Sequence, residues 1–154
     1  GAAILTHPGR NIQAPFEMID VLAESGADPE KIIMGHIDRT VLEKDALLKL
    51  AERGTYLEYD LFGMETSYYA LSDIDLPSDA QRIGFIKLLI EAGFADRIVL
   101  AHDVFAKSRL TKYGGPGIGH ILENIVPRML EAGISENDIN KMTVQNPARI
   151  LPFS

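Results

Sequence analysis

Residues Ile98–Asp103 read Ile-Val-Leu-Ala-His-Asp, an apolar run of strand-forming residues that ends on a histidine and an aspartate. The same arrangement occurs in Ile4–His7 and Ile32–His36, which each end on a histidine. A loop and then a helical pattern follow each run, so we expect these polar side chains where parallel strands stop. That edge of a parallel sheet is where ligands bind. The three strand endings make a metal-dependent active site the leading hypothesis.

The rest of the chain continues the alternation of strands and helices. Strands are predicted at 2–7, 32–36, 55–60 and 97–103, and helices near 15–25, 41–53, 79–92 and 119–132. Asn146-Pro147 predicts a last helical turn with Asn146 as its N-cap. Four βα units in a row favour a right-handed parallel sheet covered by helices. Such a sheet is either a small doubly wound sheet or half of an eight-stranded barrel. A strand that begins almost at the first residue, which is not Met, favours the half barrel and a chain cut from a longer one.

Composition excludes several classes of function. The 154 residues are 46% hydrophobic and 24% charged, as expected for one globular domain. A net charge of −7 argues against nucleic acid as a partner. No apolar run approaches the roughly 18–20 residues that cross a bilayer, so no membrane partner is expected. The chain has no cysteine, which excludes disulfides, thiolate metal ligands and a cysteine nucleophile, and we expect a cytoplasmic protein.

The strand endings supply residue types that bind zinc and similar metals, namely imidazole and carboxylate. His7 and His36 are about one βα unit apart, so we expect them side by side on adjacent strands. Asp103 ends the fourth strand, where it would ligate a metal and take a proton from bound water. Consecutive strand residues point to opposite faces, so we assign Asp103 to the site and His102 to the helix side. The alternative for each histidine is an ordinary core residue at a strand end.

Other polar residues near the predicted mouth have two interpretations each. Arg39 either binds an anionic group or makes a surface ion pair that contributes little. Asp60 closes the third strand and is either a hydrogen-bond partner of the site or a strand-end cap. His120 is more simply a partly exposed helix residue than a ligand. The glycine-rich segment 111–119 does not fit a phosphate loop, and we expect a mobile lid there.

Several segments resemble one known family. They are Thr6–Arg10, Gly35–Thr40, Leu57–Gly63, Ala101–Asp103, Lys112–Gly115 and Gln145–Arg149. Together they are similar to the phosphotriesterase family of the amidohydrolase superfamily, and within it to the phosphotriesterase-related branch. The resemblance runs through nearly the whole chain. It implies an α/β fold, the (β/α)8 TIM barrel, of which residues 1–154 are the C-terminal half with strands five to eight.

The resemblance also implies a site with two divalent metals, zinc in the first place, bridged by hydroxide. His7 and His36 match the histidines of the more exposed metal. Asp103 matches the aspartate that binds the buried metal and helps to deprotonate the nucleophilic water. The family's His-x-His motif and its bridging carboxylate have no counterpart here, so the chain holds half a site. The implied reaction is attack of a metal-bound hydroxide on an ester, lactone, amide or phosphoester bond.

Two departures bear on the substrate. Arg39 and Leu61 stand where bacterial phosphotriesterases carry an aspartate and a histidine, so organophosphate hydrolysis is not implied. A guanidinium at the mouth suits a carboxylate or sulfonate. We therefore expect a small-molecule substrate that is an acidic N-acyl amide, ester or lactone.

Three hypotheses remain at this point. The chain is the C-terminal half of a binuclear metal hydrolase, or it is a catalytically incomplete half barrel. In the second case it needs the missing N-terminal half or associates with itself as a homodimer. The third and least favoured hypothesis is a free-standing α/β binding module with a complete small sheet.

Overall fold

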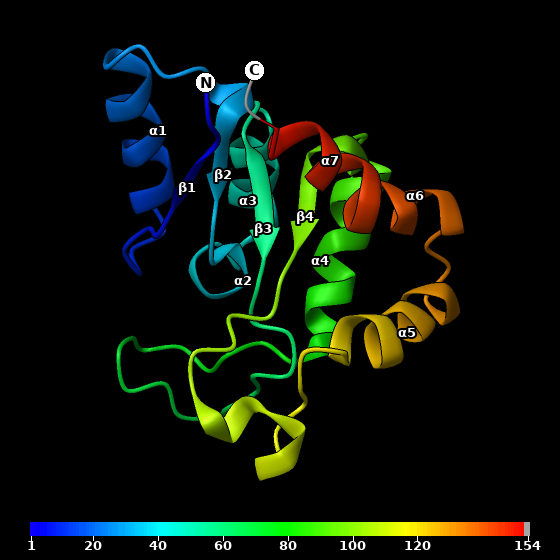
Figure 1. The fold of residues 1–154 in the computed structure, drawn as a ribbon. Coiled ribbons are helices and arrows are strands. Elements are labelled where there is room, and N and C mark those ends of the chain that lie inside the picture. The colour runs from blue at the N-terminus through cyan, green and yellow to red at the C-terminus, as the bar shows by residue number, and fades with distance from the viewer. Residues whose placement is uncertain (153–154) are drawn as a thin grey trace.

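The computed structural model describes residues 1–152, and a four-stranded parallel sheet lies at its centre (Figure 1). The strands are β1 (Ile4–Thr6), β2 (Ile32–Met34), β3 (Tyr56–Tyr59) and β4 (Ile98–Leu100). Each strand pairs in parallel with the next one along the chain, in the order β1-β2-β3-β4. A doubly wound sheet needs a reversal of strand order, and this sheet has none. The predicted strands are confirmed; β2 is shortened at its C-terminal end and the other three are shortened at both ends.

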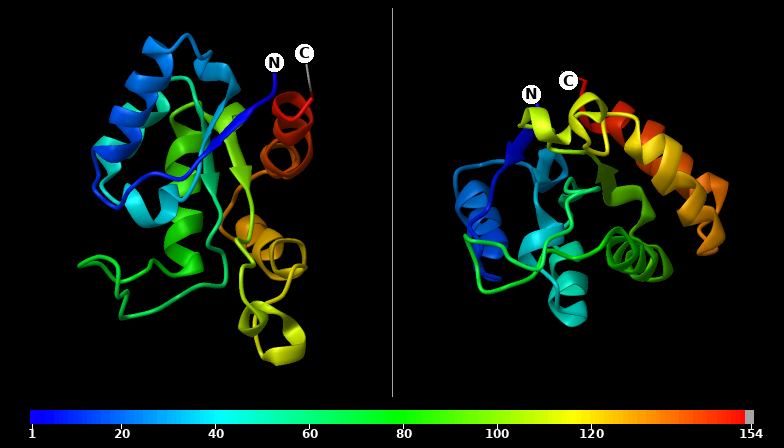
Figure 2. Two further views of the ribbon diagram at one scale, coloured as in Figure 1. Left: turned by 60° about the vertical axis from the view of Figure 1, so that its left-hand side comes forward. Right: turned by 90° about the horizontal axis from the view of Figure 1, so that it is seen from below.

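The helices lie in an arc along one side of this sheet (Figure 2). The α-helices are α1 (Ala14–Glu24), α2 (Ile37–Thr40), α3 (Lys44–Ala51), α4 (Asp79–Glu91), α5 (Val126–Glu131), α6 (Glu136–Asn140) and α7 (Asn146–Ile150). Short 3-10 turns are η1 (Pro29–Lys31), η2 (Ala95–Arg97), η3 (Lys107–Arg109) and η4 (Thr111–Tyr113), and π-helical segments are η5 (Ile121–Ile125) and η6 (Lys141–Gln145). No helix within residues 1–152 is long and apolar enough to cross a membrane.

The core lies between the sheet and these helices. Met34, Leu57 and Ile98 point to the helix side and are fully buried. Leu47 of α3 and Ile86 of α4 pack on the same side and are also fully buried. Removing such side chains from water contributes about 1.5–3 kcal/mol each. This layer fixes the strands, and so fixes where their carboxyl ends stop.

The other face of the sheet is only partly covered. Ile33, Tyr56 and Val99 pack there with Ile150 of α7. Leu5 of β1, by contrast, is 64% exposed. In a closed barrel this face is filled by side chains and β1 has a neighbour on both sides. The fold is therefore that of a half barrel, with helices outside and an open inner face.

The last helical turn does not begin as predicted. Asn146 is not an N-cap; it lies in a continuous helix that runs from α6 through η6 into α7. Its buried side-chain amide donates to the carbonyls of Ala95 and Ile98, 2.9 and 2.7 Å away. The Asn146 side chain thus links the last helix to the start of β4. Pro147 follows a π-helical segment, where the wider turn accommodates a residue without an N–H.

Candidate active site

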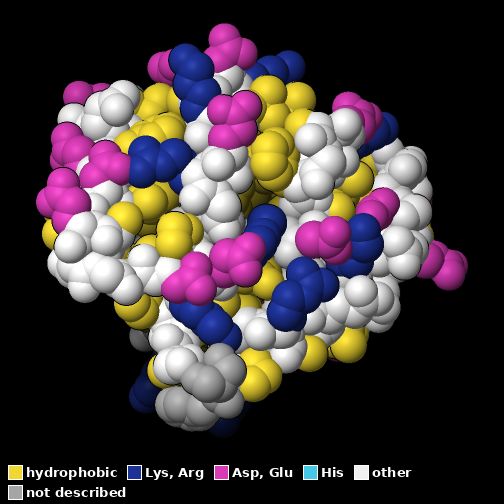
Figure 3. All heavy atoms as spheres, turned by 90° about the horizontal axis from the view of Figure 1, so that it is seen from above, with side chains coloured by type: hydrophobic (Ala, Val, Ile, Leu, Met, Phe, Trp, Pro, Cys, Tyr) yellow, Lys and Arg dark blue, Asp and Glu magenta, His cyan; other side chains and the backbone are white. Residues whose placement is uncertain are grey.

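A cavity of about 410 Å³ lies at the carboxyl ends of the strands, and we call it the inner cavity. Its lining includes His7, His36 and Asp103, which the sequence assigned to the site, together with Asp60 and Glu58. The opposite edge of the sheet, seen in Figure 3, shows intermixed charged and apolar side chains and no histidine. The two histidines and the aspartate assigned to the site therefore line one cavity, at the edge that the strand endings predicted.

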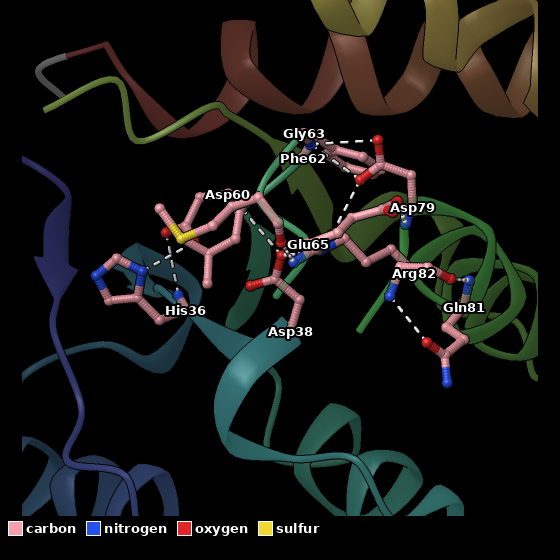
Figure 4. Close-up of polar contacts among 12 residues, drawn as sticks. His36, Asp38, Asp60, Phe62, Gly63, Glu65, Asp79, Gln81 and Arg82 are labelled. Carbon is pink, nitrogen blue, oxygen red and sulfur yellow. Dashed lines mark hydrogen bonds and ion pairs between the residues drawn. The ribbon is translucent and has the colours of Figure 1, made fainter. Parts of the chain in front are cut away.

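His36 follows β2 after one intervening residue, Gly35, and Asp60 holds it from two sides (Figure 4). The backbone N–H of His36 donates to Oδ2 of Asp60 at 3.1 Å. The ring Nδ1 of His36 lies 2.8 Å from Oδ1 of the same carboxylate. A carboxylate accepts, so we assign the ring proton to Nδ1. That leaves the lone pair on Nε2, which faces Nδ1 of His7 at 2.8 Å. Asp60 thus aims the free nitrogen of His36 at His7.

His7 completes the imidazole pair. Its ring meets that of His36 nearly at right angles, with ring centroids 4.3 Å apart and 83° between planes. Burial lowers the pKa of His7, and the neighbouring His36 and Arg39 lower it further. These effects favour the neutral ring, which is the form that binds a metal.

Gly35 allows the strands and acids to meet here. A Cβ at this position would lie 2.7 Å from the carbonyl oxygen of Thr6 and 3.1 Å from Oε2 of Glu58. Any side chain larger than hydrogen would push β1 away from β2 at the point where His7 and His36 must approach each other. The glycine is thus required by close approach, with no special backbone angle involved.

Asp103 and His102 take different directions after β4. Asp103 is exposed and lines the inner cavity. The Nε2 of His102 accepts a hydrogen bond from the backbone N–H of Ile121 at 3.2 Å, which ties it to the helix side. Asp103 and His36 have φ angles of 43° and 54°, and they are the non-glycine residues with positive φ in the described chain. Such backbone strain occurs most often at functional sites.

These residues fit part of a metal site. Within residues 1–152 no three His, Cys, Asp or Glu side chains converge so that they could hold a metal ion. Two imidazole nitrogens do converge, and the carboxylate behind His36 is the support that metal-binding histidines usually have. A catalytic zinc ion takes three protein ligands. The donor set is therefore of the right chemistry and incomplete in this chain.

Arg39 lies deeper than the sequence suggested. It is 3% exposed, and its Nη1 donates to Oγ1 of Thr40 at 3.2 Å. Its Nη2 donates to the Pro8 carbonyl and lies 3.2 Å from Nε2 of His7. The guanidinium thus holds the loop that carries His7. Whether Arg39 also binds substrate stays a prediction.

A buried ionic network behind the site was missed from the sequence (Figure 4). Arg82 of α4 is fully buried and donates to Asp38 at 2.8 Å and to Asp79 at 2.9 Å. Asp38 also accepts from the backbone N–H of Leu61 at 2.9 Å. His120 joins the network through Asp79, with Nε2 2.8 Å from the carboxylate. His120 therefore has a structural partner and lies outside the inner cavity.

Glu58 was also missed from the sequence. It precedes Asp60 by two residues and lines the same cavity, so the two-residue period of β3 was a signal that could have found it. Burial raises the pKa of Glu58 to about 8, and the neighbouring Asp60 raises it in the same direction.

A smaller cavity of about 170 Å³ adjoins the same residues, and we call it the mouth cavity. It is lined by His7, Arg10, His36, Arg39, Leu61, Met64, Tyr69, Leu71, Asp103 and Phe105. Cationic and apolar side chains therefore meet beside the imidazole pair.

The glycine-rich segment, predicted as a mobile lid, folds tightly against its surroundings. A Cβ on Gly115 would lie 2.3 Å from the backbone of Ser108 and Arg109. A Cβ on Gly63 would lie 2.5 Å from the Pro116 ring. At Gly63 and Gly115 a side chain would collide with neighbouring atoms, so close packing accounts for glycine at these positions. Motion of the glycine-rich segment stays a prediction.

The fold and the site together define half of an α/β barrel with a polar centre at the carboxyl ends of its strands. The sequence profile of the Phosphotriesterase family matches residues 1–151, and the chain belongs to this family. The family resemblance and the fold class predicted from the sequence are confirmed.

Curated relatives have a common name. N-acetyltaurine hydrolase of Bos taurus is 52% identical over 154 residues, which is 99% of this chain and 44% of the relative. N-acetyltaurine hydrolase of Homo sapiens is 51% identical over the same share. The chain thus spans less than half the length of the curated relatives that it matches.

Solved structures are similar over nearly the whole chain. A resiniferatoxin-binding protein from Rhodobacter sphaeroides superposes with a TM-score of 0.89 and 32% identity, covering 96% of this chain and 41% of that one. A mutant phosphotriesterase-like lactonase from Deinococcus radiodurans superposes with a TM-score of 0.78 and 28% identity. The match covers 97% of this chain and 47% of the lactonase chain.

Proposed function

We propose that this chain forms half of the active site of a phosphotriesterase-family hydrolase that cleaves an acidic N-acyl amide. The observation that carries the proposal is the array of Asp60, His36 and His7 at the carboxyl ends of the strands. The relatives named N-acetyltaurine hydrolase support the substrate class, because N-acetyltaurine joins an amide to a sulfonate. This is the kind of acidic amide that the sequence suggested.

In this proposal His7, His36 and Asp103 hold divalent metal, with zinc as our choice. The metal supplies Lewis acidity, which polarises the scissile carbonyl and lowers the pKa of a water molecule. Asp60 keeps the His36 proton on Nδ1 and so keeps Nε2 free. The carboxylate of Asp103 accepts the proton that the attacking water loses. A small-molecule substrate and a cytoplasmic location remain part of the proposal.

A second candidate concerns the chain in isolation: a half barrel that is catalytically incomplete. The 64% exposure of Leu5 on the inner face supports it, and so do the two converging imidazoles that have no third partner within residues 1–152. Such a chain would need an N-terminal half, or would pair with itself as a homodimer. Two tightly held metal equivalents per isolated chain would contradict this candidate.

The test is a chimaera in which this chain replaces the matching segment of the bovine relative. We expect zinc-dependent release of taurine from N-acetyltaurine, lost on chelation and restored by zinc. His36→Asn and Asp103→Asn should each abolish turnover. Asp45→Asn, at an exposed position of α3, is the matched control for Asp103→Asn and should keep activity within about threefold, because Asp45 lines neither cavity. A folded, zinc-loaded chimaera that releases no taurine would refute the substrate.

A further inference from the structure

Arg10 lies three residues after His7, in the loop that follows β1. Its Nε donates to the hydroxyl oxygen of Tyr69 at 2.9 Å, and its Cζ lies 5.5 Å from the centre of the Tyr69 ring. Tyr69 belongs to the loop that follows β3, so this contact joins two loops at the same edge of the sheet. The guanidinium is therefore held in place by a neutral partner.

The contact through Nε leaves both Nη groups of Arg10 without a hydrogen-bond partner among residues 1–152. Two Nη groups form the planar fork that binds a carboxylate or sulfonate through paired hydrogen bonds. No carboxylate of the described chain makes an ion pair with Arg10 or with Arg39. In a protein of net charge −7, two unpaired arginines beside one cavity indicate an anion-binding region.

Arg10 and Tyr69 line the mouth cavity together with His7, His36 and Asp103. Arg10 and Tyr69, together with Leu71, also line a larger cavity of about 520 Å³, so the two cavities adjoin at these residues. A substrate that reaches the imidazole pair through the mouth cavity passes this guanidinium.

Arg39 differs from Arg10 in its availability. Arg39 is 3% exposed, and its Nη atoms contact Thr40, the Pro8 carbonyl and His7. An anion would have to displace these contacts to obtain a paired interaction. Arg10 is only partly buried and has its fork free.

We propose that Arg10, oriented by Tyr69, binds the anionic group of the substrate and sets the preference for acidic N-acyl amides. Arg39 is a positioning residue that holds the His7 loop. The apolar side chains of Leu61 and Leu71 cover the short linker between the anion and the amide. This inference rests on the proposed hydrolase function, because it names the substrate contact of that same site.

The test compares two substrates in the chimaera: N-acetyltaurine and its neutral methyl sulfone analogue. Arg10→Gln should raise KM for N-acetyltaurine about ten- to a hundredfold and change kcat less than about threefold, as expected for one charged contact. KM for the sulfone should not change. Arg10→Lys keeps the charge without the planar fork, so its KM for N-acetyltaurine should lie between those of the parent and Arg10→Gln. Tyr69→Phe should raise KM for N-acetyltaurine severalfold. Arg53→Gln, a surface arginine paired with Asp20, is the matched control.

An active chimaera whose KM for N-acetyltaurine is unchanged by Arg10→Gln would overturn the inference and leave the proposed function intact. Equal losses for both substrates would also overturn it, because they would indicate a structural role. An inactive chimaera would refute the proposed function instead. The Arg10 side-chain Nε–H signal in an NMR titration with N-acetyltaurine then decides the inference: a saturable shift supports it, and no shift overturns it.

Discussion

Arg82→Met is expected to be among the most destabilising single changes in this fold. The arginine and its partner Asp38 have no exposed side-chain surface, and Asp79 has 4%. Methionine fills a similar volume but leaves two buried carboxylates without their cation. Removing one partner of a buried ion pair costs about 3–5 kcal/mol of folding free energy.

The pH dependence of this cost follows from Asp38. Burial raises the pKa of Asp38 from 3.8 to about 6, Asp60 raises it in the same direction, and Arg82 lowers it. Because the pKa of Asp38 is raised in the folded state, its carboxyl adds nothing unfavourable to folding below about pH 4. As the pH rises from about 4 through 6, the folded state loses stability relative to the unfolded state. Without Arg82 the pKa of Asp38 should rise further, so we expect the folded variant to keep the Asp38 proton to a higher pH than the parent. Each pH unit then costs about 1.4 kcal/mol for that proton.

Between pH 5 and pH 7 the parent releases the Asp38 proton midway, whereas the variant keeps it. The cost of Arg82→Met should therefore grow by about 1.4 kcal/mol over this range. Urea denaturation of the chimaera at both pH values measures it. Arg53→Met is the control and should cost less than about 1 kcal/mol, since its pair with Asp20 is at the surface. A cost for Arg82→Met below about 1 kcal/mol, or one independent of pH, would refute the reasoning.

Three further predictions use the same chimaera. Glu58→Gln should leave the melting temperature unchanged near pH 4.5 and raise it at pH 8. The reason is that the parent loses stability as the pH rises toward the Glu58 pKa of about 8. A difference in melting temperature that is the same at both pH values would contradict this. Gly35→Ala should cost about 1–3 kcal/mol in urea denaturation, because its Cβ would meet the β1 backbone at 2.7 Å. Gly84→Ala, with no atom within 4 Å in helix α4, should be neutral or stabilise by up to about 1 kcal/mol, and equal losses at both glycines would count against the close-approach argument. Asp60→Asn should weaken zinc binding about 10- to 100-fold in a chelator competition, and an unchanged affinity would mean that Asp60 does not orient His36.

Much of the fold could be predicted because its signals are local. Apolar runs that end on polar residues define the strands, and the parallel arrangement then brings their ends to one edge. His7 and His36 meet for this reason, although they are 29 residues apart. Asp60 follows from the same rule, since it ends the neighbouring strand.

The rest depends on contacts between units that no local pattern contains. Asp79 and Arg82 are three residues apart, which is the spacing of an ordinary surface ion pair on a helix. Nothing local indicates that Arg82 is buried against Asp38, which lies 44 residues away in the sequence. Asn146 resembled an N-cap because Pro147 follows it, yet its side chain is used at β4. Arg10 lies in a loop, and its orientation depends on Tyr69 from a different loop.

The left-handed backbone at His36 and Asp103 has a consequence for protein engineering. A non-glycine residue in this conformation costs about 1–2 kcal/mol, which glycine would recover. At exposed Asp103 this gain is available, so a library screened only for heat resistance would enrich glycine there and delete the carboxylate, whereas glycine at His36 would leave the buried Asp60 without its imidazole partner. Stabilising designs on this scaffold should hold these two codons fixed and seek their gains elsewhere.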